Sequence, residues 1–295
     1  MHPIIVALLV LSLIVIGVLI SALKKNFKFD TPIFFTLVSA VLSLVFFVFT
    51  YILKNGFSFA MDFGLLPYAI PFGICFATST LTSVKALKLG DLSLVSLVTS
   101  FGLLIPSFYG IFFLKEPVGF LFYIGLAFFA LCVTCINSKS KSNQPIQKKP
   151  FTFKWLLYVL LASISNGFCS VFQTMQQRAY GGTCGDELMI VALIEVVLIL
   201  LVFTLIVERR NIKVALKSAL VLGSLTGIIT GLNNFIVMMF TGQKLLPVTV
   251  FFPLLSGGGL IAAFIVGLLC YKEKYSLVQY CGFVFGVISV VLLNL

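Results

Sequence analysis

The chain has 295 residues, of which 60% are hydrophobic and only 10% are charged, and its mean hydropathy is +1.18. A water-soluble domain of this length needs far more charged surface, so the composition excludes one and predicts an all-α protein embedded in a lipid bilayer. The formal net charge is +11. Because the basic residues fall between apolar runs, where they orient helices against anionic lipid, they do not indicate nucleic-acid binding.

Ten apolar runs follow one another along the chain. A hydrocarbon core of about 30 Å requires roughly 20 apolar residues in a helix, and each run has about that length. The expected membrane helices cover residues 4–23, 32–53, 67–87, 92–114, 118–137, 155–179, 188–207, 218–241, 246–270 and 276–294. Residues 138–154, which have the composition of a loop, separate the first five runs from the last five.

The ends of the two halves resemble each other. Glu116 and Glu273 are 157 residues apart, and so are Gly125 and Gly282. This shared offset predicts two repeats, residues 1–137 and 155–295, joined by the basic linker 138–154. Each repeat has an odd number of crossings, so the two enter the membrane in opposite directions, as the inverted repeats of many secondary transporters do. Channels and membrane scaffolds also arise by duplication, so the repeat alone does not decide the function.

A short motif points to one family. The first half contains Leu114-Lys115-Glu116 with a glycine nine positions later, and the second contains Tyr271-Lys272-Glu273 with the same spacing to its glycine. Together with five plus five helices and the basic linker, this resembles the EamA-type branch of the drug/metabolite transporter superfamily over nearly the whole chain. The resemblance implies a ten-helix transporter with a central cavity between its halves, which moves amino acids, metabolites or drugs. The substrate itself does not transfer from the family.

Basic residues predict the orientation. Sixteen Lys and Arg residues lie on the side of the linker and four on the opposite side. By the positive-inside rule, the linker is expected in the cytoplasm and both termini outside, for a multi-pass protein of the plasma membrane. The family resemblance implies the reverse, with cytoplasmic termini, so the two orientations stay open at this stage.

One acidic residue lies deep within an apolar run. Glu195 is the eighth residue of run 188–207, about 10 Å along the helix at 1.5 Å per residue. A charged group at such depth costs on the order of 3 kcal/mol. We expect Glu195 to face the central cavity, where a protonatable carboxyl group could couple proton movement to transport. The alternative is a neutral carboxylic acid that hydrogen-bonds to a neighbouring helix.

Polar side chains at helical spacing predict the rest of the binding site. In run 155–179, residues 166, 170, 173 and 177 are polar and follow one another at steps of four, three and four, which places them on one helix face. A polar face inside a membrane points toward partners or water. The candidate cavity residues are Asn166, Gln173, Gln177, Glu195, Thr230, Asn233, Asn234 and Ser100. Hydrogen bonds between helices are the alternative role for these groups.

Two corresponding runs contain helix-breaking residues. Pro106 lies inside run 92–114, and Pro253, Gly257 and Gly258 lie inside run 246–270. Proline removes a backbone donor, so these helices are expected to be kinked or interrupted and to act as hinges. Paired interruptions in corresponding helices are typical of transporter sites, although ordinary membrane kinks explain them equally well.

Other residues predict structural contacts. Glu116 and Glu273 each stand just before a run, where a carboxylate stabilises the positive end of the following helix. Gly223, Gly227 and Gly231 recur at every fourth position and predict close approach to another helix.

These patterns favour a transporter that is not an enzyme. The single histidine, His2, excludes His-based metal sites, and no cofactor or metal site is predicted. The sequence lacks a GxxxxGK[ST] phosphate-binding loop, so energy must come from a gradient or from exchange. We expect an exporter or exchanger of a small metabolite, amino acid or drug, with the solute and the lipid bilayer as its partners and an unassigned oligomeric state. The alternatives are an intramembrane enzyme acting on a lipid-linked substrate and a non-transporting membrane scaffold.

Overall fold

The computed structural model describes residues 3–57, 62–136, 152–272 and 276–293, and this part of the chain is helical and contains no strand. The first half holds α1 (Pro3–Asn26), α2 (Pro32–Asn55), the 3-10 turn η1 (Phe63–Leu65), α3 (Leu66–Leu89), α4 (Leu92–Gly102), α5 (Leu104–Phe112) and α6 (Phe120–Ile136). The second half holds α7 (Phe153–Ala179), α8 (Gly185–Phe203), the π-helical turn η2 (Thr204–Glu208), α9 (Ile212–Gly242), α10 (Val248–Leu269) and α11 (Leu277–Leu293). These helices follow the ten expected runs closely.

The helices have the length and composition of membrane spans. Among the described residues, eight helical segments are long and apolar enough to cross a membrane, and α6 and α11 contain shorter apolar helices. Large apolar side chains such as Leu8, Leu11 and Val15 on α1 are exposed, as expected where a helix faces lipid. The chain therefore has the architecture of a polytopic membrane protein.

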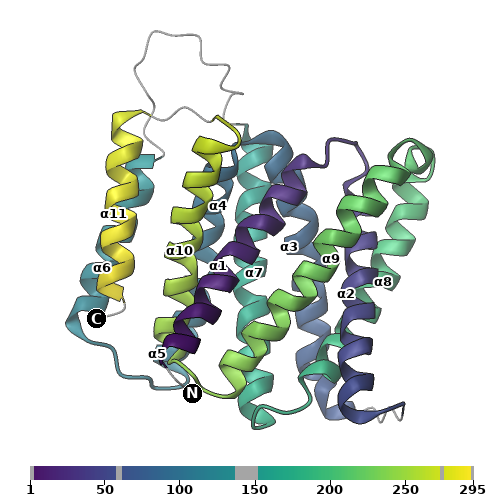
Figure 1. Ribbon diagram of the computed structural model, residues 1–295, viewed down its shortest axis with the longest axis horizontal. Coiled ribbons are helices and arrows are strands. Elements are labelled where there is room, and N and C mark those ends of the chain that lie inside the picture. Colours follow the sequence, from purple (N-terminus) through teal and green to yellow (C-terminus); the bar gives the residue numbers. More distant parts are fainter. Residues whose placement is uncertain (1–2, 58–61, 137–151, 273–275, 294–295) are drawn as a thin grey trace.

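The helices pack side by side, as Figure 1 shows. The pair α6 and α11 lies at one end of the bundle, α2 and α8 lie at the other, and α1, α3, α4, α7, α9 and α10 fill the middle. The start of α1 and the end of α11 lie on one side, which we call the terminal side. The end of α6 and the start of α7 lie on the opposite side, which we call the linker side.

Small residues bring α2 and α9 close together. A Cβ atom on Gly223 would lie 3.0 Å from the side chain of Val38, and one on Gly231 would lie 2.8 Å from the ring of Phe46. The hydroxyl of Ser43 donates a hydrogen bond of 2.6 Å to the carbonyl of Gly227. The repeated glycines thus make the close interhelical contact that their spacing predicts.

The expected run 92–114 is broken into α4 and α5 at Leu103. Pro106 has no N–H to donate to the carbonyl of Gly102, four residues earlier, so the helical ladder fails there. At this break the backbones of α4 and α7 touch. A Cβ atom on Gly102 would collide with the backbone of Ser163, and one on Gly167 would collide with the carbonyl of Gly102.

The corresponding helix was expected to be kinked or interrupted. It is not interrupted, because α10 is continuous from Val248 to Leu269 with Pro253 inside it, and the kink at Pro253 stays a prediction. The proline removes a bond to the carbonyl of Thr249, the second residue of the helix. Since that loss falls between the first and second turns, close to the helix start, the helix continues through Gly257 and Gly258.

Candidate functional site

A cavity of about 260 Å³ lies where the two halves of the chain meet. It is lined by α1, α3 and α4 from the first half and by α7, α9 and α10 from the second. Its lining includes Lys24, Leu87 and Val95, each within one turn of the linker-side end of its helix. From there it extends to Asn166 and Asn233, in the middle of the bundle. It continues to Val237 of α9 and Phe252 of α10, so it reaches from the linker-side ends of α1, α3 and α4 to within about one turn of the terminal-side ends of α9 and α10.

Half of the residues in the cavity wall are polar. Each of its six helices contributes at least one hydroxyl or amide group, among them Ser21, Ser79, Ser96, Asn166, Thr230 and Ser256. Among the described residues, Lys24 is the one lining residue with a formally charged side chain, and no acidic residue lines the cavity. Such groups can bind the polar parts of a small solute at membrane depth.

Most of the expected cavity residues lie in this wall. The structure brings together Asn166, Gln173, Thr230, Asn233, Asn234 and Ser100. Several of them also form hydrogen bonds between helices, so these residues both line the cavity and connect helices. Gln173 donates a 2.9 Å hydrogen bond to the side-chain oxygen of Asn234. Ser100 and Ser256 each donate to the other's carbonyl, over 3.3 and 2.8 Å.

Gln177 does not line this cavity, contrary to expectation. It lies in the last turn of α7 on the terminal side, is buried, and donates a 2.6 Å hydrogen bond to the side chain of Gln176. Its side chain fits against Gly242 of α9, where a Cβ atom would collide with it. The polar face of α7 continues beyond the cavity, and its last member serves packing.

The expectation that Glu195 faces the cavity is also wrong, since α8 contributes no residue to the lining. A Cβ atom on Gly73 would lie 2.7 Å from a carboxyl oxygen of Glu195 and 3.2 Å from the carbonyl of Ala192, so this carboxyl group lies between α3 and α8. Gly227 of α9 fits against Leu42 of α2 in the same way. Glu195 thus occupies an interhelical packing position rather than the cavity.

The contribution of α1 to the cavity, and part of that of α3, were not predicted. Gly17, Ser21 and Lys24 all line the cavity, and their steps of four and three place them on one helix face. Ser79 and Ser83 do the same on α3. The helical spacing could have identified these residues, but Lys24 also has the ordinary place of a basic residue at the end of an apolar run.

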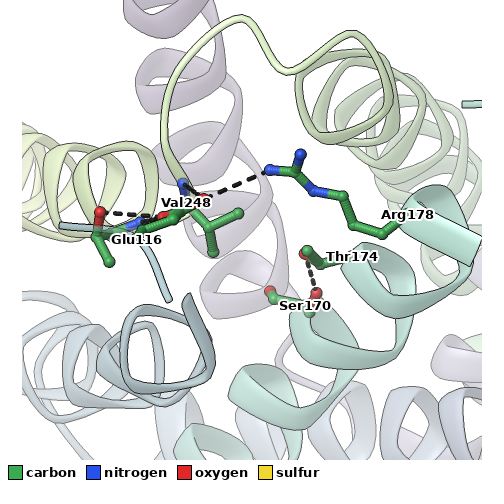
Figure 2. Close-up of polar contacts among 6 residues, drawn as sticks. Glu116, Ser170, Thr174, Arg178 and Val248 are labelled. Carbon is green, nitrogen blue, oxygen red and sulfur yellow. Dashed lines mark hydrogen bonds and ion pairs between the residues drawn. The ribbon is translucent and has the colours of Figure 1, made fainter. Parts of the chain in front are cut away.

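Glu116 closes the interface on the terminal side (Figure 2). Its carboxylate accepts hydrogen bonds from the backbone N–H groups of Val248, over 3.1 Å, and Thr249, over 2.9 Å. The hydroxyl of Thr249 donates a further bond of 3.0 Å, and a terminal nitrogen of Arg178 lies 3.4 Å from the carboxylate. Four contacts therefore connect the first half to two helices of the second. We call Glu116, Arg178 and the first turn of α10 the terminal-side closure.

Glu116 was expected to cap the helix that follows it, α6, and this was wrong. Lys115 adopts a positive φ of 54°, and the N–H of Glu116 bonds back to the carbonyl of Gly110. The chain therefore turns back beside α5, which lies against α10, and the carboxylate stabilises the positive end of α10 instead. Glu273, its counterpart in the sequence repeat, lies outside the described residues.

One face of α7 connects the cavity with the terminal-side closure. Ser170, Thr174 and Arg178 follow at steps of four, and Figure 2 shows them along one side of the helix. Ser170 lines the cavity, Thr174 donates a 2.7 Å hydrogen bond to the carbonyl of Ser170, and Arg178 reaches Glu116.

An apolar cluster also seals that side. It consists of buried residues of α1, α9 and α10, namely Val10, Leu13, Ile236, Val237, Phe240, Val248, Phe251 and Phe252. The rings of Phe240 and Phe251 stack with their centroids 4.8 Å apart. Leu13, Val237 and Phe252 also line the cavity, so the cluster forms its terminal-side wall.

No family model and no curated protein matches the chain. Twenty-eight chains of solved structures do match. One of them, a crystal structure, is 12% identical, with a TM-score of 0.69, over 98% of this chain and 96% of that chain. At this identity the likeness shows the fold alone, and it shows that the whole chain adopts an arrangement of helices already seen by crystallography.

Proposed function

We propose that the chain is a secondary transporter that moves a small polar solute by alternating access between two inverted five-helix repeats. The observation that carries the proposal is the cavity between the halves, half of whose lining residues are polar, which extends to the linker side and is bounded by an apolar cluster on the terminal side. A bound solute would be exposed to one side at a time if the halves rocked about it.

The pairing of helices supports the inverted repeats. In chain order, α1 corresponds to α7, α2 to α8, α3 to α9, α4 and α5 together to α10, and α6 to α11. When each helix is replaced by its counterpart, the α3–α7 contact becomes α9–α1 and the α4–α7 contact becomes α10–α1, and both of these contacts are present. The same replacement turns the α2–α9 contact into α8–α3. Three further contacts join a helix to its own counterpart, namely α2–α8, α4–α10 and α6–α11. This is the pattern expected when two similar units meet across a two-fold axis.

Detailed packing gives a second line of support. Gly227 fits against the carbonyl of Ser39 and the side chain of Leu42, while Gly73 fits against the carbonyl of Ala192 and Glu195. Ala192 of α8 follows Ser39 of α2 by 153 positions, and Glu195 follows Leu42 by the same number. Since related residues make the same contact in both halves, we infer that the halves are structural repeats. With the Leu-Lys-Glu motif, this favours membership of the EamA-type transporters.

The dimensions and position of the cavity favour a small solute. Its volume of about 260 Å³ is below the range of about 300 to 1,000 Å³ that is usual for drug-sized ligands. An amino acid or a small metabolite therefore fits better than a large drug. If the linker is cytoplasmic, as the basic residues predict, the cavity faces the cytoplasm and loads solute for export or exchange.

Opening to the terminal side requires that the terminal-side closure separate. The carboxylate of Glu116 must leave the N–H groups of α10 and the guanidinium of Arg178, and the apolar cluster must part. A bound solute can compensate for this loss only if it binds the other state better, as any ligand-driven conformational change requires. The enzyme and scaffold alternatives gain no support from the cavity, whose described lining residues include neither a carboxylate nor a histidine.

The proposal can be tested with a variant that fills the cavity. Gly259 lines it, and a Cβ atom there would meet no atom within 4 Å, so Gly259→Phe adds a ring to the hollow without a backbone collision. Gly119 has the same free space but lies in the exposed loop before α6, which makes Gly119→Phe a matched control.

Purified protein in liposomes would be loaded with a mixture of amino acids and organic acids, and exchange of each labelled solute would be measured. We expect the wild type and Gly119→Phe to exchange one solute class, and Gly259→Phe to fall to the rate of protein-free vesicles. Two results would contradict the proposal. One is that solutes raise the melting temperature of the wild type but none of them is exchanged, and the other is that Gly259→Phe exchanges solute at the wild-type rate.

A further inference from the structure

Among the described residues, no carboxylate pairs with the one charged side chain that lines the cavity. Lys24 is partly buried, and its ammonium donates a 2.9 Å hydrogen bond to the hydroxyl of Ser83. An ammonium group has three donors, so this neutral partner uses one of them. Within the described parts of the chain, Lys24 forms no ion pair.

Two acidic side chains on the linker side, Glu208 and Asp30, are engaged elsewhere. The carboxylate of Glu208 accepts hydrogen bonds from the N–H groups of Ile33, over 3.0 Å, and Phe34, over 2.8 Å, at the start of α2. Asp30 lies 3.7 Å from the ammonium of Lys88. Neither Glu208 nor Asp30 lines the cavity, so neither neutralises Lys24 there.

Building on the proposed transport function, we infer that the solute carries an anionic group, a carboxylate or a phosphate, that binds Lys24. A partly buried cation without a counter-ion is unfavourable, and an anion that forms charge-assisted hydrogen bonds with it relieves that cost. Ser21 and Ser83 line the cavity beside Lys24. Their hydroxyls donate to the carbonyls of Gly17 and Thr80, and each would exchange that bond to donate to the same anion. The hydroxyl and amide groups deeper in the cavity, such as Asn166 and Asn233, then bind the uncharged remainder of the solute.

Matched probes test the charge preference directly. Melting temperatures of the purified full-length protein would be measured with lactate and lactamide, with glycerol 3-phosphate and glycerol, and with the cation choline. We expect an anion to stabilise the wild type more than its neutral partner, and choline to have no effect. Lys24→Gln should lose this difference, while Lys24→Arg, which keeps the charge, should retain it. Lys28→Gln removes an exposed charge outside the lining and serves as the control.

A second measurement needs no ligand. Ser96 lines the cavity, so Ser96→Cys places a thiol inside it. Its rates of modification by an anionic sulfonate and a cationic ammonium methanethiosulfonate would be compared by mass spectrometry of the labelled peptide, which leaves the native cysteines in place. Adding Lys24→Gln should lower the anion-to-cation rate ratio by on the order of threefold. Adding Lys28→Gln should change it little.

The inference is overturned if no anionic probe stabilises the wild type more than its neutral partner, or if Lys24→Gln keeps the full preference and the wild-type rate ratio. Transport is judged separately. Exchange of a neutral solute that is insensitive to Lys24→Gln would refute the anionic solute and leave the transporter standing. Charge-dependent binding without exchange in liposomes would support the anion site and refute transport.

Discussion

The two ends of the interface between the halves are built differently. On the terminal side, Glu116 binds two backbone N–H groups and Arg178, and a Cβ atom on Gly110 would lie 3.0 Å from both Glu116 and Thr249. Around the cavity, a Cβ atom added to Gly17 or Gly259 would meet no other atom within 4 Å. A few strong contacts hold one end closed, while the other end has space and polar groups that can change partners. We infer that the closed end stores most of the energy that a conformational change must overcome.

The largest effect is expected at Glu116. Glu116→Ala removes the acceptor for two N–H groups and a hydroxyl and leaves Arg178 without its partner. Because truncating one member of a partly buried charged network leaves its partners unsatisfied, we expect a loss of about 3 kcal/mol in the free energy of unfolding. Denaturant unfolding in detergent micelles measures it.

Glu187→Ala is the control, because Glu187 is another partly buried acidic residue on the terminal side and lies in the first turn of α8. It should change stability by no more than about 1 kcal/mol, the usual contribution of a charge to a helix end. Equal losses in the two variants would contradict the special role assigned to Glu116.

A methyl group added at each end sharpens the comparison. Gly259→Ala gains helix propensity in open space and should stabilise the protein by about 0.5 to 1 kcal/mol. Gly110→Ala gains the same propensity but presses on Glu116 and Thr249, so it should be less stable than Gly259→Ala by about 1 to 2 kcal/mol. Melting curves of the two variants give the difference. If both stabilise equally, the terminal side is not more tightly packed than the cavity.

The smallest effect is expected in the cavity wall. Ser100→Ala removes one of the two hydrogen bonds between α4 and α10, which should cost about 0.6 kcal/mol. The hydroxyl of Thr134 bonds within its own helix and is exposed, so Thr134→Ala provides a matched control in the same unfolding measurement. A loss at Ser100 as large as that at Glu116 would remove the distinction between the two ends.

The sequence predicted the helices well because hydrocarbon thickness sets their length and charged residues mark their ends. It did not predict which helix Glu116 would cap. That partner, α10, is more than 130 residues away, and only the turn at Lys115 directs the carboxylate toward it. The continuity of α10 through Pro253 was missed for a local reason, since the effect of a proline depends on its distance from the helix start.

The cavity was predictable where polar residues recur on one face, as for Asn166 and Gln173 of α7. Glu195 misled because the cost of a carboxyl group in lipid indicates that it lies against other helices or water, but not which helices it lies between. Lys24 escaped notice for the opposite reason, because a lysine at the end of a span is ordinarily read as an interfacial anchor. Periodicity identifies faces, and only the fold decides which faces meet.

The contact between Gly102 and Gly167 constrains how such a protein could move. Here one half touches the other through bare backbone, beside the break at Leu103 and at the edge of the cavity. Two helices in contact through their main chains cannot approach further, and the hydroxyl of Ser163 donates a 2.9 Å hydrogen bond to the carbonyl of Val98 beside the contact. We therefore expect this point to act as a fulcrum, so that widening one end of the molecule narrows the other.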